Sequence, residues 1–373
     1  MKKIYRKLLR LFISLIILVG VIFGSYVIYL TSQYYRIDDN MNYTNNINKK
    51  NNNLVLLNEE YTITTYNIGF GAYNHEFSFF LDSGEMLDGT KTKGTGSKGE
   101  TVEVTTFNTV NAINTVSNVN PDFMLFQEVD VKATRSHKVN QYEKMTEKFT
   151  DFNSIYISNF HSGYLFYPIF NPHGKSESGI VTLSNKKIDT VIRHKLQIDE
   201  SFPTKFFDLD RCFSASYLPI EGSSKYLVLV NVHLSAYDEG GIYRAKQWKQ
   251  LNDFFKEEID KGNYIVCGGD FNHDISNDPT FEGFPNMQKK PEWVYTLNDR
   301  DLLANSGLKF ATSTNAPTCR STDIPYTKGV NYTVVIDGFI TSRNVEVVHV
   351  ETIDVDFLYS DHNPVMLKFR LLS

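Results

Sequence analysis

The chain has 373 residues, of which 41% are hydrophobic and 14% aromatic, so it can bury the core of one large α/β domain or of two smaller ones. The formal net charge is −5, yet five basic residues lie within the first ten positions and the first acid is Asp38. Without those five, the chain has 33 basic and 43 acidic residues, a net charge of about −10. A domain with this negative charge repels polyanions unless a bound cation or a local basic groove intervenes.

Three cysteines, Cys212, Cys267 and Cys319, are too few for a disulfide framework and have no zinc-binding spacing. At least one of them stays unpaired. Cys267 lies in the apolar run "YIVCGGDF", which favours a buried thiol that packs as a small hydrophobic side chain.

The N-terminal segment predicts a membrane anchor over residues 1–30, with a transmembrane helix over 8–30. Residues 11–30 carry no charge and are about as long as a helix that crosses the hydrocarbon core. The preceding basic residues place the N-terminus in the cytoplasm, so we expect a single-pass protein of the cell membrane with its domain outside. A cleaved signal peptide is the alternative, but its apolar region is shorter and ends in small residues, unlike "YVIYLTSQYY".

Residues 31–57 form an Asn-rich stretch without apolar periodicity, typical of a linker. We therefore expect one folded domain over residues 58–373, and the sequence shows no internal repeat.

The first part of this domain predicts a strand, a loop, a helix and a second strand. Residues 61–70 are rich in β-forming residues and end in a glycine-containing turn. Residues 74–100 are rich in Gly, Lys and Thr and predict a surface loop. Apolar residues recur at helical spacing over 106–120, and an apolar strand follows over 121–129.

Strands dominate the rest of the chain. Residues 178–185 and 225–234 read as strands, and 242–262 as an amphipathic helix that ends at a glycine. Two more strands follow over 263–271 and 332–340. Many strands with few helices, in a chain of this length, predict packed sheets with helices outside.

Polar residues of one chemical kind stand where several apolar strands end. They are Asn67 in "TYNIG", Glu128 in "FQEVD", His233 in "VNVHLS", Asp270 and Asn272 in "GGDFNHD", and Asp361 and His362 in "YSDHNPV". An acid at the end of an apolar strand is costly unless it is solvated, paired or bound to a metal. Carboxylate and amide oxygens suit Mg²⁺, with Mn²⁺ or Ca²⁺ as alternatives, whereas thiolate-bound zinc would need a cysteine cluster.

This ordered set of motifs, together with "NYTVVIDGFI", resembles the endonuclease/exonuclease/phosphatase superfamily, which includes deoxyribonuclease I. The resemblance spans roughly residues 60 to 370 and looks greatest for bacterial members near the sphingomyelinase-like branch. It implies a four-layer α/β/β/α sandwich, in which two mixed sheets lie face to face, helices cover both outer sides and the active site lies at one edge.

The resemblance also implies roles for individual residues. Glu128 would be the principal metal ligand, with Asn67 beside it and Asp361 completing or orienting the site. His362 would be the general base or the imidazolium that stabilises the attacked phosphate, and Asp337 would orient it.

His233 would donate a hydrogen bond to a phosphate oxygen, Asp270 would orient or deprotonate the attacking water, and Asn272 would stabilise the oxyanion. The family resemblance does not decide whether Asp270 or His362 is the base. Taken alone, His233 is typical of a structural residue and Asp337 of a turn cap. Their place in the order of motifs favours catalysis instead.

Three further residues are candidates for substrate binding. Arg135 and Arg320 could each hold phosphate through two hydrogen bonds, and each could equally be a structural or solvated arginine. Tyr164 is a candidate because the family's phosphate-contacting aromatic or histidine has no clear counterpart in "HGKSESGIVTLS".

We therefore expect a Mg²⁺-dependent phosphodiesterase that attacks phosphorus with water and forms no covalent intermediate. Its substrate would be a lipid head group, a nucleic acid or a small phosphodiester, and we expect no obligate protein partner. The anchor and the acidic body favour a lipid or small molecule over nucleic acid. A catalytically silent surface-binding domain is the alternative of another class, but it would not need all eight site residues together.

Overall fold

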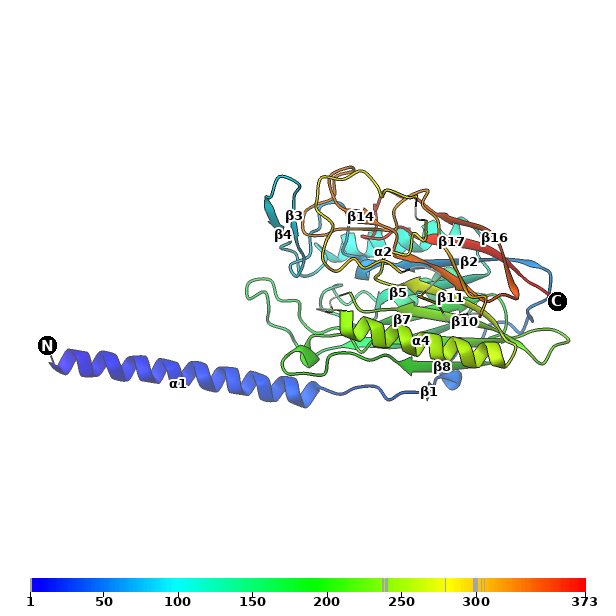
Figure 1. Cartoon of the computed structure of the whole chain (residues 1–373). Helices are drawn as coiled ribbons and strands as arrows, with labels where there is room; N and C mark the ends of the chain where they lie inside the picture. Colours follow the sequence, from blue (N-terminus) through cyan, green and yellow to red (C-terminus); the bar gives the residue numbers. More distant parts are fainter. Residues whose placement is uncertain are drawn as a thin grey trace.

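Two β-sheets pack face to face at the centre of the computed structural model, which describes residues 2–373 apart from 237, 239–240, 279, 298–300, 303 and 305 (Figure 1). One sheet has seven strands in the order β1-β8-β9-β10-β11-β15-β12. Its strands are β1 (Met41–Asn42), β8 (Thr190–Lys195), β9 (Cys212–Pro219), β10 (Tyr226–His233), β11 (Tyr264–Asp270), β15 (Asp337–Thr341) and β12 (Lys309–Ala311).

The second sheet has six strands in the order β16-β17-β2-β5-β7-β6. Its strands are β16 (Val345–Thr352), β17 (Val365–Leu371), β2 (Glu60–Asn67), β5 (Phe123–Asp130), β7 (Glu177–Ser184) and β6 (Asn153–His161). Apolar residues from the facing sides of both sheets, such as Leu125, Leu229, Val266 and Phe339, are fully buried in one core cluster. Burial of this apolar surface is the main force that holds the sheets together.

Helices cover the outer face of each sheet. α2 (Val102–Ser117) and α3 (Gln141–Lys148) pack on the six-stranded sheet, and α4 (Ile242–Asp260) packs on the seven-stranded sheet. Thr101 and Asn140 cap the first two helices by accepting hydrogen bonds from backbone N–H groups. The predicted four-layer α/β/β/α sandwich is therefore confirmed.

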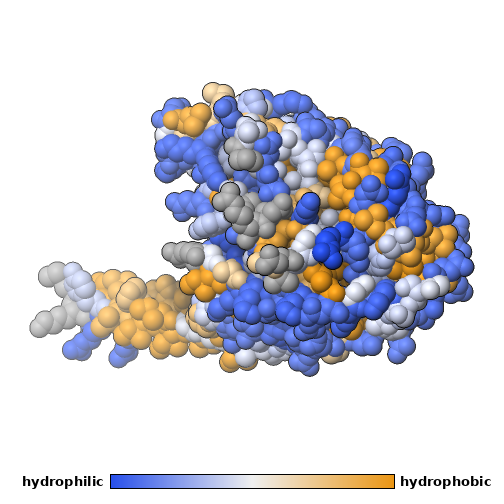
Figure 2. All heavy atoms as spheres, turned by 45° about the vertical axis from the view of Figure 1, so that its right-hand side comes forward, coloured by the Kyte–Doolittle hydropathy of each residue, from blue (hydrophilic) through white to orange (hydrophobic). Residues whose placement is uncertain are grey.

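The N-terminal helix α1 (Lys2–Gln33) projects from the domain as a long, exposed and largely hydrophobic rod (Figures 1 and 2). Its apolar window is 0% buried, which separates it from an ordinary core helix. By length and composition α1 could cross a membrane, and a signal sequence would meet the same two criteria.

Residues 31–57 differ from the expected linker because they pack on the domain. β1 pairs with β8 and extends the seven-stranded sheet. Ile47 and Val55 are buried in the core between the sheets. The side-chain oxygen of Asn153 also accepts the backbone N–H of Lys50 at 2.7 Å. A few apolar residues and nonlocal hydrogen bonds thus order a stretch whose composition is typical of a spacer.

Residues 74–100, predicted as a surface loop, contain a short hairpin of β3 (Ser83–Glu85) and β4 (Lys91–Lys93). Phe77 and Phe80, which precede the hairpin, are buried. The remaining short elements are η1 (Thr44–Asn46), η2 (Gly69–Gly71), η3 (Thr204–Phe206), β13 (Cys319–Arg320) and β14 (Thr333–Val334).

Strand direction gathers the polar motifs at one edge of the sandwich. β2 is parallel to β5, and β10 is parallel to β11, so these strands end on the same side of their sheets. β15 and β17 run antiparallel to β11 and β2, and therefore begin at that edge. In Figure 1 this is the side from which α1 projects.

Candidate active site

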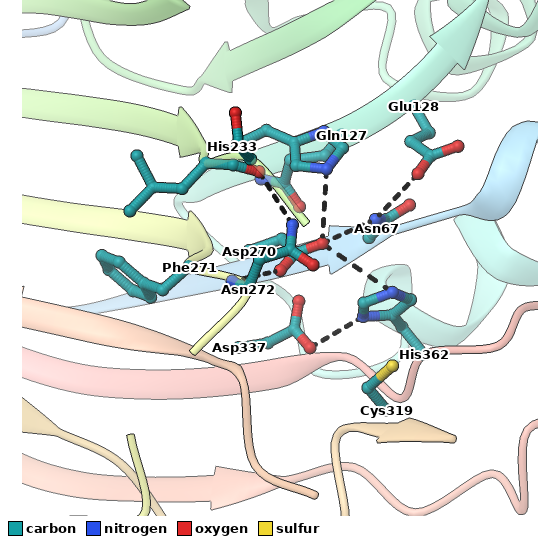
Figure 3. A network of polar contacts seen from close by, with 12 residues as sticks. Asn67, Gln127, Glu128, His233, Asp270, Phe271, Asn272, Cys319, Asp337 and His362 are labelled. Carbon is teal, nitrogen blue, oxygen red and sulfur yellow. Dashed lines mark hydrogen bonds and ion pairs between the residues drawn. The ribbon is translucent and has the colours of Figure 1, made fainter. Parts of the chain in front are cut away.

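Strand register places the central residues of the site next to each other. His233 lies opposite Asp270 where β10 pairs with β11, and Asp270 lies opposite Asp337 where β11 pairs with β15. In the other sheet, Asn67 ends β2 opposite Gln127 of β5. The amide nitrogen of Asn67 lies 3.0 Å from Asp270 Oδ2, so the two sheet ends meet in one cluster (Figure 3).

Glu128 owes its position to an irregularity in β5. The register between β5 and β7 shifts between Phe126 and Val129, and Glu128 has a φ of +53°. A bulge of this kind redirects a side chain, and a non-glycine residue at positive φ is a strain that proteins concentrate at functional sites. The side chain of Glu128 is 23% exposed and Asp361 is half-buried, so these two carboxylates form the open side of the cluster.

Asp361 and His362 lie in the loop that precedes β17, rather than at the end of an apolar strand as we expected. Ser360 fixes this loop because its hydroxyl donates to the backbone oxygen of Asn67 at 2.8 Å and accepts the N–H of His362 at 3.2 Å. The two neighbouring side chains point in different directions. Asp361 lies against Gly69, whereas His362 reaches into the cluster.

One carboxylate oxygen, Asp270 Oδ2, is the centre of the cluster (Figure 3). Besides Asn67, it has His233 Nε2 at 3.4 Å and His362 Nε2 at 3.8 Å. The other oxygen of Asp270 accepts the backbone N–H of Asn272 at 2.9 Å. Three side chains that can donate hydrogen bonds therefore converge on one buried anionic oxygen.

His362 and Asp337 form a buried ion pair. The ring Nδ1 of His362 donates to Asp337 Oδ2 at 2.8 Å. Burial lowers the pKa of His362, but the carboxylate of Asp337 outweighs this effect and holds the pKa well above its usual value. The imidazolium form of His362 is thus favoured, and its Nε2 faces Asp270.

The pKa of Asp270 is raised, whereas the pKa of His233 is lowered. Burial and the negative charge of Asp337 raise the pKa of Asp270 to about 6. Burial, reinforced by the positive charges of Arg211 and His362, lowers the pKa of His233 well below its usual value. The site therefore combines a carboxylate that titrates near neutrality, a neutral histidine and a cationic histidine.

Asn272 lies beside this group but uses its amide locally. Its Nδ2 donates to the backbone oxygen of Leu234 at 2.8 Å, and its φ is +49°. The residue therefore links the loop after β10 to the loop after β11.

The donor set fits a hard divalent cation. Burial raises the pKa of Glu128, and the guanidinium of Arg135 opposes this rise, so a cation beside Glu128 would favour its charged form. Glu128 and Asp361 offer carboxylate oxygens, and Asn67 could add an oxygen after rotation of its amide, which now points its nitrogen at Glu128 at 3.4 Å. Asp270, Asp337 and His362 also lie within 4.8 Å of one another. A metal bound there would have to displace the proton that His362 donates to Asp337.

The three candidate substrate-binding residues have other contacts. Arg135 forms two hydrogen bonds with Asp130, at 2.9 and 3.0 Å, and lies 4.0 Å from Glu128. Arg320 is buried and donates to the backbone oxygens of Asn74 and Ser321. The contacts of Tyr164 within the described part of the chain are with α1 and with Phe166, and none reaches the cluster.

Sequence reasoning missed Arg211, which directly precedes β9 in "DLDRCF" and belongs to no motif. Its side chain is buried, and its charge lowers the pKa of both Glu128 and His233. It also missed Gly69, whose φ of +50° and close contact with Asp361 permit no larger side chain. Antiparallel pairing of β9 with β10 brings Arg211 to this edge, because β9 begins where β10 ends.

A four-layer α/β sandwich with an acid and histidine cluster at one edge defines a class of hydrolases that act on phosphate esters. The sequence profile of the Endonuclease/Exonuclease/phosphatase family matches residues 65–362. The chain therefore belongs to this family, whose members generally depend on divalent metals.

Solved structures share the fold at low sequence identity. An endonuclease/exonuclease/phosphatase from Beutenbergia cavernae is 17% identical, with a TM-score of 0.53 over 85% of this chain and 72% of that one. A family protein from Bacteroides thetaiotaomicron is 14% identical, with a TM-score of 0.51 over 83% and 98% of the two chains. ANGEL2, a 2',3'-cyclic phosphatase solved with adenosine-2',3'-vanadate, is 14% identical, with a TM-score of 0.52 over 84% and 96%. Comparison with curated protein sequences gives no match.

Proposed function

We propose that the chain is a divalent-metal-dependent phosphodiesterase, held in the cell membrane by α1 with its catalytic domain outside. The observation that carries this proposal is the convergence of Asn67, His233 and His362 on one oxygen of Asp270. The two histidines could bind the oxygens of a phosphoryl group, because phosphate is an anion of similar hydrogen-bonding capacity.

The pKa shifts favour Asp270 as the general base. A carboxyl group with a pKa of about 6 is largely ionised at neutral pH and can accept a proton from the attacking water. His362, whose pKa is raised by Asp337, would stay protonated and stabilise negative charge on the phosphoryl oxygens.

Neutral His233 would donate one hydrogen bond to a non-bridging oxygen. Asn272 would donate the second hydrogen of its amide to the oxyanion, since the first is donated to the backbone oxygen of Leu234. Glu128, Asn67 and Asp361 would hold a divalent ion, with Mg²⁺ expected and Mn²⁺ or Ca²⁺ as alternatives. A bound divalent ion supplies charge neutralisation at the phosphoryl oxygens, which lowers the barrier to attack.

A hydrolysis assay with purified full-length protein tests this proposal. We expect turnover of bis(p-nitrophenyl) phosphate with Mg²⁺, loss of turnover with a chelator, and recovery when Mg²⁺ is restored. Glu128→Gln should reduce kcat by about 100-fold or more, as removal of one electrostatic stabiliser does elsewhere. Glu351→Gln, on the exposed strand β16, is the matched control and should keep wild-type activity.

Absence of metal-dependent turnover with every phosphoester offered would overturn the proposal and favour a silent binding domain. If Glu128→Gln and Glu351→Gln were equally active, Glu128 would not be the metal ligand.

A further inference from the structure

A loop between β6 and β7 exposes an unusual run of large apolar side chains. In "YLFYPIF", residues 164–170, the exposed fractions are 57% for Phe166, 59% for Tyr167, 79% for Ile169 and 101% for Phe170. Isolated apolar residues are common on protein surfaces, but four within five positions form a patch that marks an interaction site. We call residues 164–170 the aromatic loop.

The aromatic loop lies against the C-terminal end of α1. The hydroxyl of Tyr26 donates to the backbone oxygen of Tyr164 at 3.1 Å, and the hydroxyl of Tyr29 accepts the N–H of Tyr164 at 3.0 Å. The rings of Tyr26 and Phe166 also pack edge to face at 5.4 Å. The aromatic loop and the C-terminal end of α1, which both expose apolar side chains, therefore lie side by side.

A second segment completes this surface. Leu30 of α1, Leu165 of the aromatic loop and Phe206 of η3 form one small buried cluster. On either side of Phe206, Phe202 is 60% exposed and Phe207 is 46% exposed. We call the exposed residues of the aromatic loop, together with Phe202 and Phe207, the apolar seat.

Packed aromatic rings connect the aromatic loop to the candidate active site. The guanidinium of Arg135, next to Glu128, lies over the ring of Phe70 at 3.9 Å. Ring contacts then continue from Phe70 through Tyr73, Phe79 and Phe80 to Tyr167, with centroids 4.9 to 6.1 Å apart. The apolar seat and the site thus belong to the same edge of the sandwich, the one from which α1 projects (Figure 1).

We infer that the apolar seat inserts into the surface of the bilayer that α1 crosses and turns the active-site edge toward the lipid head groups. The substrate class is then the phosphoester of a membrane lipid head group, an inference that rests on the proposed function. The ring of Tyr, with its polar hydroxyl, favours the interface between head groups and acyl chains, and Phe and Ile add apolar surface that inserts there. α1 alone tethers the domain, whereas the seat adds a second contact that fixes its orientation.

The insertion can be measured with a fluorescent probe on the full-length protein in liposomes. All three native cysteines are buried, so a new surface cysteine can be labelled selectively. Phe170→Cys places the probe in the seat, and Val348→Cys places it on β16, where the native side chain is 40% exposed. We expect spin-labelled lipids to quench the probe at position 170 and to leave the probe at position 348 bright. Equal quenching at both positions, or none at 170, would overturn the inference.

The orientation of the active site is tested by activity on two substrates. The double variant Ile169→Asp/Phe170→Asp adds charge to the seat, and Val348→Asp is its matched control. We expect the ratio of lipid phosphodiester hydrolysis to bis(p-nitrophenyl) phosphate hydrolysis to fall about tenfold or more in the double variant, because two large apolar contacts are lost. The control should keep the wild-type ratio.

The proposed function and the lipid head group as substrate would be overturned by different results. A quenched probe at position 170 with no hydrolysis of either substrate overturns the proposed function but supports the seat. Hydrolysis of the soluble diester with an unchanged substrate ratio in the double variant overturns the lipid head group as substrate.

Discussion

Substitution of Asp337 by asparagine tests the ion pair that sets the charge of His362. The amide keeps the size of the side chain and one acceptor oxygen, but it removes the negative charge 2.8 Å from His362 Nδ1. A hydrogen bond to a charged group contributes about 1.5 to 3 kcal/mol, so kcat should fall about 10- to 100-fold if the imidazolium acts in the transition state.

The pH profile separates this role from a merely structural one. Asp337 raises the pKa of His362, so Asp337→Asn should lower that pKa and discharge the imidazolium at a lower pH. The alkaline limb of the pH dependence of kcat should therefore move to lower pH in the variant. We would measure kcat with bis(p-nitrophenyl) phosphate across this range and compare it with Asp189→Asn, a surface control.

Two results would refute the reasoning. Wild-type kcat with an unmoved alkaline limb would mean that Asp337 does not control His362. A shift of the acidic limb alone would mean that His362 does not act as an imidazolium, because the charge of Asp337 also raises the pKa of Asp270 and its loss would move that limb by itself. Thermal unfolding of the variant checks that the fold is intact.

Two further predictions concern acid stability and the metal site. Burial lowers the pKa of His173 from 6.5 to about 4. Between these two pH values the unfolded chain binds a proton more readily than the folded chain. The free energy of unfolding therefore decreases as the pH falls below 6.5. This loss amounts to about 2 kcal/mol at about pH 5, and urea unfolding of His173→Gln should show a smaller fall between neutral pH and that pH than wild type. If both proteins lose stability equally, His173 is not the source. Gly69→Ala should destabilise the fold by about 1 to 3 kcal/mol and weaken metal-dependent turnover, since its Cβ would lie 2.8 Å from Asp361 Oδ1. Gly89 also has a positive φ, but a Cβ at this position would have no atom within 4 Å, so Gly89→Ala should add backbone strain alone. Equal losses of turnover in both variants would contradict a role for Gly69 in placing Asp361.

Local patterns predict packed sheets with helices outside and most of the strand-end residues, whereas the four layers are implied by the family resemblance. Apolar runs of strand length end in Asn67, His233 and Asp270, and helical periodicity marks α2 and α4, whereas the shorter α3 is not predicted. Since parallel neighbours end at the same edge, these residues converge once the two sheets form.

Features that depend on nonlocal pairing could not be predicted from these patterns. The bulge that redirects the side chain of Glu128 exists only because the register between β5 and β7 shifts there, and no local sequence signal predicts that shift. The ordering of residues 31–57 depends on pairing of β1 with β8, which is distant in the chain. The contact of Tyr164 with α1 likewise joins segments more than 130 positions apart.

The most direct test of the account is a crystal structure of the protein with Mn²⁺ and inorganic phosphate, with the metal located by its anomalous signal. We predict one ion bound by the carboxylate of Glu128, and a phosphate beside it whose oxygens accept hydrogen bonds from His233 and His362. An ion bound away from Glu128, or a phosphate that contacts neither histidine, would contradict the central claim that this cluster is a site of phosphoester hydrolysis.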